Sequence, residues 1–231
     1  MASDTFHQVY QELLSTALGP DSVLVDIGSK DGIIASQMSE EFGCKSVSID
    51  LEFDLSEQLS TSLMKADGTQ LPFRTNTVDA VISNMVFEHI PNEEQLISET
   101  SRVLKPDGNF VVIFPNRTWP FDSHGFPPGT PWIPRKVGTK LFSMASFRSE
   151  YYDRFMHPSS SIEVKRILGE HFGNVTFESD RLLDVDYVES RRGRLLRIFR
   201  SPISYAFSIP LLRSVAETSF PIAIYHAEVP N

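Results

Sequence analysis

The stretch VDIGSKDG, residues 25–32, has residue types and spacing that could hold a nucleotide. Asp26 precedes Gly28 by two positions, and Gly32 follows Gly28 by four. Dinucleotide-binding turns favour G-x-G-x-x-G and phosphate-binding loops need G-x-x-x-x-G-K-[ST], and neither pattern occurs here. Lys30 stands near the place of the missing middle glycine, which counts against NAD. The acid at Asp26 instead suits a ligand that carries a cationic amine rather than a diphosphate.

A second acid, Asp50, comes 24 residues after Asp26 and ends the segment KSVSID, which we expect to be the second strand. In an open parallel sheet, ligands bind beyond the carboxyl ends of the strands, where the strand order reverses. An acid at the end of the second strand can accept two charge-assisted hydrogen bonds from ribose hydroxyls. Asp50 is therefore a candidate ribose-binding residue.

Short apolar runs and amphipathic stretches alternate along the chain and must position these residues. Such alternation favours βαβ units and a parallel sheet. We expect strands at SVLVDIG, KSVSID, LMKAD, TVDAVIS, NFVVIF, NVTFES and FPIAIYHAEV. We expect helices over 4–18, 32–42 and 54–61 and in PNEEQLISETSRVLKPDG and SSIEVKRILGEHF, with Gly43 capping the second and Pro106 and Gly108 ending the fourth.

Several motifs resemble those of class I S-adenosylmethionine-dependent methyltransferases. DIGSKDG resembles the first family motif, D-x-G-x-G-x-G, with Lys30 in place of the middle glycine. KADGTQLPF is similar to the third motif, and FRTNTVDAVISNMVFEHI to the fourth-strand segment. LISETSRVLKPDGNFVVIFPN is similar to the helix, turn and fifth strand. The resemblance covers residues 22–116 in order and is closest to the subfamily that methylates small molecules, lipids and sugars.

The resemblance implies an α/β fold, a Rossmann-like, doubly wound, seven-stranded and mostly parallel sheet with helices on both faces and the last strand antiparallel. It also implies S-adenosylmethionine as the cofactor. Leu51 would pack against the adenine, and Asp67 would accept from its amino group, with Gly68 allowing a close approach. The implied cofactor-binding set is Asp26, Gly28, Ser29, Gly32, Asp50, Leu51, Asp67, Gly68, Asn84 and His89. Packing beside a helix is an equal alternative for His89, and we expect Lys30 to point to solvent.

Oxygen nucleophiles usually need a base, because a neutral hydroxyl is weakly nucleophilic at pH 7. His124 in WPFDSHGF is the first candidate, with Asp122 to orient or pair with it. A loop histidine that faces water is the alternative. Tyr151 and Tyr152 could line a pocket, although such tyrosines more often pack. The segment PNRTWPFDSHGFPPGTPWIP resembles a loop of methyltransferases in cell-surface polysaccharide and glycolipid synthesis.

We therefore expect O-methylation of a small molecule, sugar or lipid-linked intermediate. No D-P-P-Y-like sequence follows the fourth strand, so methylation of DNA base amines is not expected. No Cys/His cluster has metal-ligand spacing, and we expect no metal. Two alternatives stay open: a non-catalytic or regulatory S-adenosylmethionine-binding protein of the same fold, and an NAD(P)-dependent oxidoreductase.

The net charge of -9 disfavours nucleic acid as a partner, although five arginines fall within residues 191–200. The stretch 191–213 is basic and apolar, and could contact a membrane surface, bind a partner, or pack as a lid. One cysteine, Cys44, and no secretory signal or apolar membrane span favour a cytoplasmic setting, with membrane association through 191–213 as the open alternative.

The chain is expected to form one methyltransferase domain over residues 1–231. It carries a substrate-side loop and helical insert at 115–160 and a basic-apolar insert at 180–220 before the last strand. The oligomeric state is not predicted.

Overall fold

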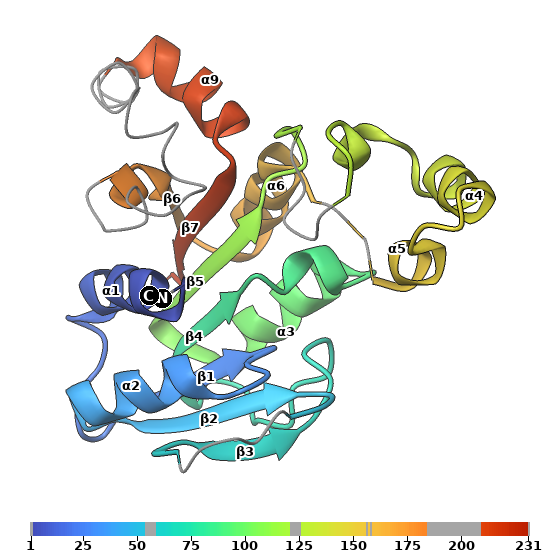
Figure 1. Cartoon of the computed structure of the whole chain (residues 1–231). Helices are drawn as coiled ribbons and strands as arrows, with labels where there is room; N and C mark the ends of the chain where they lie inside the picture. Colours follow the sequence, from blue (N-terminus) through green and yellow to red (C-terminus); the bar gives the residue numbers. More distant parts are fainter. Residues whose placement is uncertain are drawn as a thin grey trace.

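The computed structural model describes residues 2–53, 59–120, 126–155, 157, 159–183 and 209–230. Its centre is one seven-stranded sheet in the order β3-β2-β1-β4-β5-β7-β6 (Figure 1). The strands are β1 (Val23–Ile27), β2 (Lys45–Asp50), β3 (Ser62–Lys65), β4 (Val78–Asn84), β5 (Leu104–Pro115), β6 (Asn174–Phe177) and β7 (Ile222–Glu228). Only β7 runs antiparallel to its neighbours, so the predicted seven-stranded Rossmann-like sheet is confirmed.

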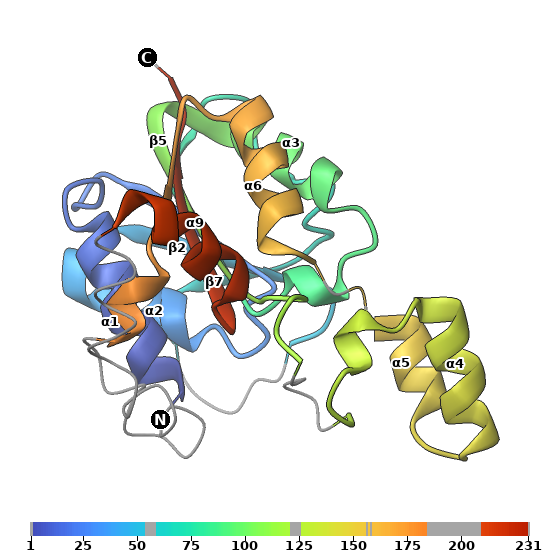
Figure 2. The ribbon, with the colours of Figure 1, turned by 90° about the horizontal axis from the view of Figure 1, so that it is seen from above.

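Helices cover both faces of this sheet. In Figure 2, α1 (Ala2–Leu14) and α2 (Ile33–Phe42) lie on one side of the strands, and α3 (Glu93–Val103) and α6 (Ser161–His171) lie on the other. The remaining helices are α4 (Arg135–Met144), α5 (Ser149–Phe155) and α9 (Pro210–Ser219), with 3-10 turns η1 (Phe87–His89), η2 (Thr130–Trp132) and η3 (Ser179–Leu183). The two covering layers make the arrangement doubly wound, as predicted.

The central strands are buried without interruption because both sheet faces are covered. Val81 and Ile82 of β4 and Val111 and Val112 of β5 are adjacent in sequence, point to opposite faces, and are all fully buried. This is why the sequence shows continuous apolar runs there rather than an alternation of apolar and polar residues.

The strand order reverses between β1 and β4. β2 and β3 extend the sheet from one side of β1, and β4 and β5 extend it from the other. The residues that follow β1, β2 and β4 therefore meet at one edge of the sheet, which is the position where open α/β sheets bind ligands.

The predicted end of α3 is wrong by several residues. The helix stops at Val103 rather than near Pro106, and β5 begins immediately at Leu104. The partners of β5 on β4 shift from Val78 with Leu104 to Ala80 with Asn109, so residues 105–108 form an irregular bulge. Proline disfavours helical geometry in the residue before it, which explains the earlier stop.

Three other helix predictions need a comment. The first helix ends at Leu14 rather than at residue 18, and a turn follows it. The predicted helix over 54–61 lies largely outside the described residues, and its last three residues are not helical. Gly43 caps α2 in the left-handed conformation, as predicted.

Helices α4 and α5 form a hairpin that projects away from the sheet (Figures 1 and 2). This hairpin has an aromatic core of its own, in which Phe126, Phe142 and Tyr152 are buried together. It occupies the second half of the predicted insert at 115–160. Most of the predicted insert at 180–220 lies outside the described residues.

Replacement of Gly68 and of Gly169 by alanine should change the free energy of unfolding in opposite directions. A methyl group on Gly68 would stand 2.6 Å from Cγ2 of Ile27, whereas one on Gly169, inside α6, would meet nothing within 4 Å. We expect Gly68→Ala to lower the free energy of unfolding by about 1–3 kcal/mol through overpacking. We expect Gly169→Ala to raise it by roughly 0.5–1 kcal/mol, because alanine favours the helix. Urea unfolding of both variants measures these changes, and equal effects would contradict the packing of Gly68 on β1.

Candidate functional site

The turn between β1 and α2 is left-handed at three alternate positions. Gly28, Lys30 and Gly32 have φ angles of 74°, 49° and 71°. A lysine in this region costs roughly 1–2 kcal/mol more than a glycine. Its side chain is exposed, as expected, so the turn keeps its shape without the missing middle glycine.

The turn is tied to the second strand by its backbone. The N–H groups of Gly28 and Ser29 both donate to the carbonyl oxygen of Ile49, at 2.7 and 3.2 Å. On the other side, a methyl group on Gly28 would stand 2.3 Å from Cγ2 of Val86, which follows β4. Glycine at position 28 is required by both the positive φ and this contact.

Asp26 is buried at the carboxyl half of β1, with 2% of its surface exposed. Burial, followed by the charges of Asp31 and Asp50, raises the pKa of Asp26 from 3.8 to about 8. The carboxylates of Asp31 and Asp50 are thus close enough to disfavour ionisation of Asp26, and this acidic sheet edge is attractive to a cation.

Asp50 joins the first turn to the segment after β2. Its Oδ2 accepts from the N–H of Lys30 at 2.8 Å, and its Oδ1 accepts from the N–H of Glu52 at 3.1 Å. A carboxylate has about four lone-pair directions, so each oxygen keeps capacity for another donor. The adjacent Leu51 side chain is 59% exposed and offers an apolar surface beside this carboxylate.

Two buried polar atoms near this edge have no hydrogen-bond partner in the part of the chain that the structure describes: Oγ of Ser29 and Oδ1 of Asn84. Ser29 follows β1, and Asn84 ends the neighbouring β4. Buried polar atoms are normally satisfied, so two orphans at adjacent strand ends point to a ligand or to water.

Asp67 follows β3 and is exposed. Its Oδ1 accepts from both the N–H and the hydroxyl of Thr69 at 2.8 Å, which holds the side chain in a fixed turn. Gly68 packs on Ile27, so this turn lies against β1. The structure thus gathers the predicted residues of β1, β2, β3 and β4 at one sheet edge.

The 3-10 turn η1 follows β4 and contains His89, which is half-buried and donates its backbone N–H to the carbonyl oxygen of Val86 at 2.8 Å. Its neighbour Glu88 is a buried acid that the sequence analysis did not single out. The backbone N–H of His157 donates to the Glu88 carbonyl oxygen at 2.6 Å, which brings a second histidine to the end of β4.

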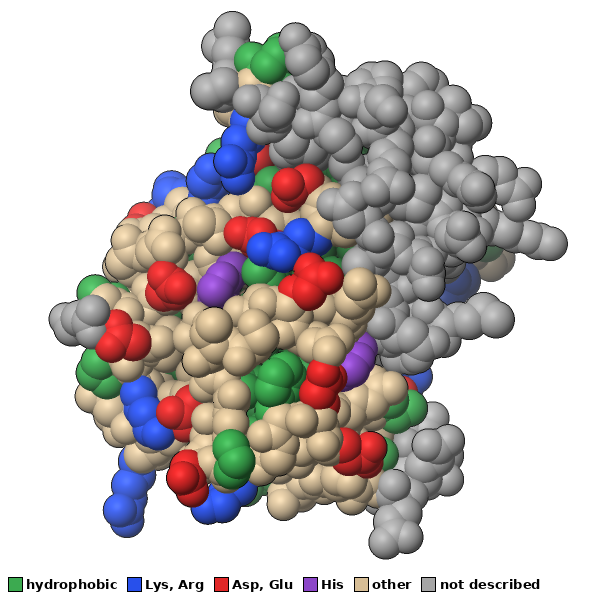
Figure 3. Space-filling model, turned by 90° about the vertical axis from the view of Figure 1, so that its left-hand side faces the viewer, with side chains coloured by type: hydrophobic (Ala, Val, Ile, Leu, Met, Phe, Trp, Pro, Cys, Tyr) green, Lys and Arg blue, Asp and Glu red, His purple; other side chains and the backbone are tan. Residues whose placement is uncertain are grey.

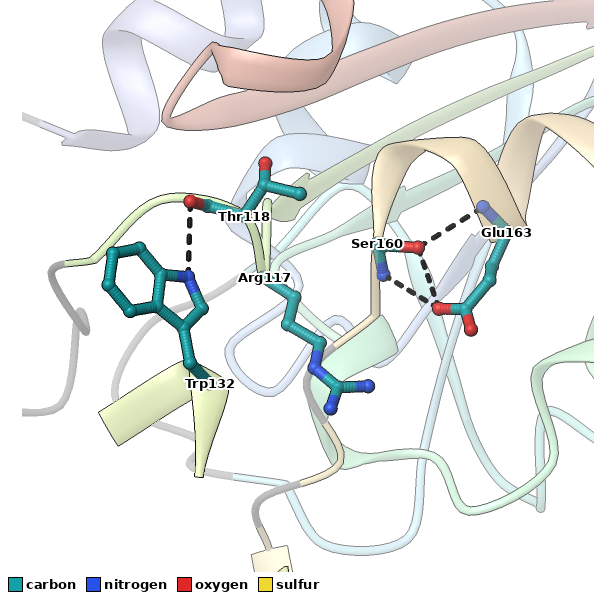
Figure 4. A pocket seen from close by; sticks show the side chains of 5 residues that line it. All are labelled: Arg117, Thr118, Trp132, Ser160 and Glu163. Carbon is teal, nitrogen blue, oxygen red and sulfur yellow. Dashed lines mark hydrogen bonds between the residues drawn. The ribbon is translucent and has the colours of Figure 1, made fainter. Parts of the chain in front are cut away.

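A hollow of about 490 Å³ lies beyond the end of β5, lined by Arg117, Thr118, Trp132, Ser160 and Glu163 (Figure 4). Trp132 donates from Nε1 to the carbonyl oxygen of Thr118 at 3.2 Å, which fixes the plane of the indole. Oε2 of Glu163 accepts from Ser160 in a capping box that starts α6. The sequence analysis missed these residues, although the S-x-x-E pattern before a helix marks the capping box.

The guanidinium of Arg117 is placed between Trp132 and the start of α6 in Figure 4. Its Nε donates to the carbonyl oxygen of Pro131 at 3.2 Å. Its Nη1 and Nη2 have no hydrogen-bond partner within the described ranges, so they are available to a ligand. Glu93 lies close by, and burial raises its pKa, with Arg117 opposing that shift.

The buried amide of Asn116 holds the walls of this hollow together. Its Nδ2 donates to the carbonyl oxygens of Thr218 and Phe220, both at 3.1 Å. Its Oδ1 accepts from the N–H groups of Ser161 at 3.2 Å and Thr118 at 3.3 Å. Side-chain bonds of one residue thus join the ends of β5 and α9 to the start of α6.

The two predicted catalytic residues, Asp122 and His124, lie outside the described residues. Tyr152 is buried in the hairpin core and donates to the carbonyl oxygen of Ile133 at 3.2 Å. Tyr151 packs against that core. The two tyrosines are therefore packing residues, which was the more common alternative.

In the described ranges, no group of three or more His, Cys, Asp or Glu side chains is placed to hold a metal ion. No helix in the same ranges is long and apolar enough to cross a membrane.

Two curated relatives are methyltransferases by name. Sarcosine/dimethylglycine N-methyltransferase of Halorhodospira halochloris is 27% identical over 185 residues, which are 73% of this chain and 63% of the relative. Malonyl-[acyl-carrier protein] O-methyltransferase 1 of Coxiella burnetii is 31% identical over 87 residues, 37% of this chain and 30% of the relative. The chain thus spans less than two thirds of the length of these relatives.

A solved structure of Haemonchus contortus phosphoethanolamine N-methyltransferase 2, in complex with S-adenosylhomocysteine and phosphomonomethylethanolamine, matches 97% of this chain and 52% of its own. The TM-score is 0.61 at 16% identity, which supports the fold. The family model described as "Methyltransferase domain" matches residues 25–112, which run from within β1 through β2, β3 and β4 into β5. This match, the methyltransferase relatives and the fold together support a class I, S-adenosylmethionine-dependent methyltransferase.

Proposed function

We propose that the chain transfers the methyl group of S-adenosylmethionine to a hydroxyl group of a small molecule, sugar or lipid-linked intermediate. The observation that carries the proposal is the buried carboxyl group of Asp26, with Asp31 and Asp50 close enough to raise its pKa. S-adenosylmethionine has a sulfonium and an ammonium group, so this sheet edge has the complementary charge. A nucleoside diphosphate would meet three acids at the same place.

The residues at this edge fit the cofactor. Ser29 and Asn84 each present a buried polar atom that lacks a partner in the described part of the chain. The exposed Leu51 side chain supplies an apolar surface for the adenine, and Asp50 has acceptor capacity left for the ribose hydroxyls. Asp67, with Gly68 beside it, would accept from the adenine amino group.

The other predicted residues have roles of the same kind. We propose that Asp26 binds the ammonium group and that Gly28 and Gly32 let the backbone of the turn approach the cofactor. His89 is proposed to contact the cofactor from η1, beside the end of β4. We propose that the side chain of Lys30 points to solvent and that only its backbone N–H, which donates to Asp50, contributes to the shape of the site.

When bound, the cofactor supplies a methyl group on a positively charged sulfur, which is a good leaving group. The chain has to align the acceptor oxygen with that methyl carbon and exclude water. We propose that His124 accepts the hydroxyl proton as the oxygen–carbon bond forms and the carbon–sulfur bond breaks, with Asp122 orienting the imidazole. The proposal for both residues rests on the sequence.

The hollow beyond β5 supports a hydroxylated acceptor. The side chain of Trp132 is 57% exposed and can stack on a sugar ring, while Arg117 offers free N–H groups and Glu163 an acceptor oxygen. The relatives named above act, by their names, on nitrogen in one case and on oxygen in the other. The relatives support methyl transfer as the class of reaction. The choice of oxygen as the acceptor atom is our proposal, based on the residues that line the hollow.

The whole proposal is tested by incubating the chain with methyl-labelled S-adenosylmethionine and matched panels of hydroxylated and amine acceptors, including sugars and lipid-linked sugars. Label should enter an oxygen-linked product. Transfer to amines alone would contradict the proposed hydroxyl acceptor and show that the chain methylates nitrogen. Cofactor binding without methyl transfer to any acceptor of the panels would favour the non-catalytic alternative.

Asp50→Ala is expected to weaken binding of S-adenosylhomocysteine by about 1–3 kcal/mol, because a charged hydrogen-bond acceptor is lost. Titration calorimetry measures the change. Asp21→Ala, which removes an exposed acid before the amino end of β1, is the matched control and should bind normally. If Asp50→Ala bound S-adenosylhomocysteine with wild-type affinity, Asp50 would not be a cofactor-binding residue.

Asp26 makes the stability of the ligand-free chain depend on pH. Its pKa is about 8 in the folded protein against 3.8 ordinarily, so between these values the folded state binds more protons than the unfolded state. Stability from this group therefore falls as pH rises through that window. Asp26→Asn does not titrate, and its melting temperature should fall less between pH 5 and pH 9.

Thermal unfolding at pH 5, 7 and 9 without cofactor measures this difference, with Asp21→Asn as the control variant. Parallel melting curves for wild type and Asp26→Asn would show that Asp26 is ionised throughout, in contradiction to its buried acidic surroundings.

His124→Ala is expected to bind S-adenosylhomocysteine normally and to lose turnover by a factor of about 10² or more, the usual contribution of a general base. His171→Ala, at the far end of α6, is the control. Turnover is measured by transfer of labelled methyl groups to the acceptor found above. Unchanged turnover in His124→Ala would mean that another group takes the proton.

A further inference from the structure

The outer face of α4 exposes a stripe of large apolar side chains. Val137 and Leu141 are each 49% exposed, Met144 is 77% exposed, and Phe147 just beyond the helix is 38% exposed. The spacing of four and three residues places the three helical side chains on one face. Apolar side chains gathered in this way mark an interaction surface more often than scattered ones do.

The three helical side chains of this stripe lie outside the hairpin's own core, whereas Phe147 also contacts that core, with its ring centroid 5.8 Å from that of Phe126. The inner face of α4 buries Phe142 and brings Gly138 against the ring of Tyr152, where a methyl group on the glycine would stand 2.5 Å from that ring. Phe126 completes the core, with its ring centroid 5.1 Å from that of Phe142. The helical side chains of the stripe therefore lie beside the packed face of α4 and remain exposed in the folded hairpin.

The charged side chains of α4 itself are all basic, and the nearest acid that contacts this helix is Asp153 of α5, whose Oδ1 accepts from the Thr139 hydroxyl at 3.0 Å. Helix α4 contains Arg135, Lys136 and Lys140 and no acid, although the whole chain has a net charge of -9. Neither lysine has a carboxylate within ion-pair distance in the ranges that the structure describes. By contrast, acidic and basic side chains are interspersed on the face shown in Figure 3. Elsewhere in the described residues, basic side chains form ion pairs, as Arg181 does with Glu12 and Glu178.

We propose that the outer face of α4, together with Phe147, docks on an anionic lipid bilayer. The apolar side chains would enter the interfacial region, while Lys136 and Lys140 extend their charged ends to lipid phosphates. The hairpin projects from the sheet in Figures 1 and 2, so the stripe can meet a broad surface. This site differs from the 191–213 stretch that the sequence indicated.

A protein partner fits these observations less well. Stable protein interfaces bury at least roughly 1,200 Å² in total, and four partly exposed side chains provide only a fraction of such a contact. Reversible membrane binding needs only a few inserted side chains and the electrostatic attraction of nearby lysines to anionic lipids. Docking here goes beyond the proposed methyl transfer and does not depend on the acceptor.

The test is flotation of the full chain with vesicles of phosphatidylcholine alone or with one quarter phosphatidylglycerol. We expect binding to the anionic vesicles, weakened by salt, and little binding to the neutral ones. The double variants Leu141→Gln/Met144→Gln and Lys136→Glu/Lys140→Glu should each lose roughly tenfold or more in vesicle affinity. Circular dichroism confirms that each variant is folded, and all altered side chains are exposed.

Matched controls remove one exposed apolar and one exposed basic side chain elsewhere. Ile162→Gln on α6 and Lys45→Glu on β2 should bind the anionic vesicles as the wild type does. The proposal is overturned by absence of wild-type binding or by equal binding of the α4 variants. It is also overturned if only neutralising the five arginines of 191–200 abolishes flotation. Concentration-dependent dimers that the α4 variants abolish, without vesicle binding, would assign the stripe to a second copy instead.

Discussion

The two hydrogen bonds from Gly28 and Ser29 to the carbonyl oxygen of Ile49 set the geometry of the sheet edge where β1, β2 and β4 end and the candidate site lies. They fold the chain back over β2 immediately after β1, and this brings Lys30 within reach of the Asp50 carboxylate. The same fold places Gly28 against Val86 at the end of β4. Three strand ends are joined in this way, and a side chain at position 28 would separate them.

The turn also explains why a buried acid can persist in a marginally stable protein. Asp26 is covered by the structure that the turn creates, and its ionisation is opposed by Asp31 and Asp50. A cation at the sheet edge would favour ionisation of Asp26, which burial and the two neighbouring charges oppose in the ligand-free chain. The cofactor binding that we propose therefore couples to the protonation of this one carboxyl group.

The sequence predicted the sheet well, because strands buried on both faces, such as β4 and β5, read as continuous apolar runs. The end of α3 was predicted too late, because the bulge at 105–108 depends on strand pairing with β4 rather than on local pattern. The clustering of the proposed cofactor-binding residues at one sheet edge was predicted from motifs, since these residues follow strands at regular positions; their role in binding stays a prediction. The hollow was missed because Arg117, Trp132 and Glu163 come from three separate segments without a shared motif.

The hairpin was also beyond the sequence analysis. In α4, Phe142 faces the aromatic core while Leu141, its neighbour in sequence, is exposed. Pattern alone does not separate the apolar residues that pack within a domain from those that remain at its surface. The distinction needs the position of Tyr152, which closes on Gly138 from the other helix.

The four hydrogen bonds of Asn116 have a consequence for how this molecule can change through evolution. They fasten the chain where it leaves β5 and where it re-enters the body at Ser161, next to the end of α9. No described residue between these two anchors pairs with a strand of the sheet, so a change in the length of the α4–α5 hairpin would leave the strand pairing intact. Trp132, which lines the hollow that we propose for the acceptor, lies in the same segment, so exchange of the segment would change that hollow while the sheet is kept.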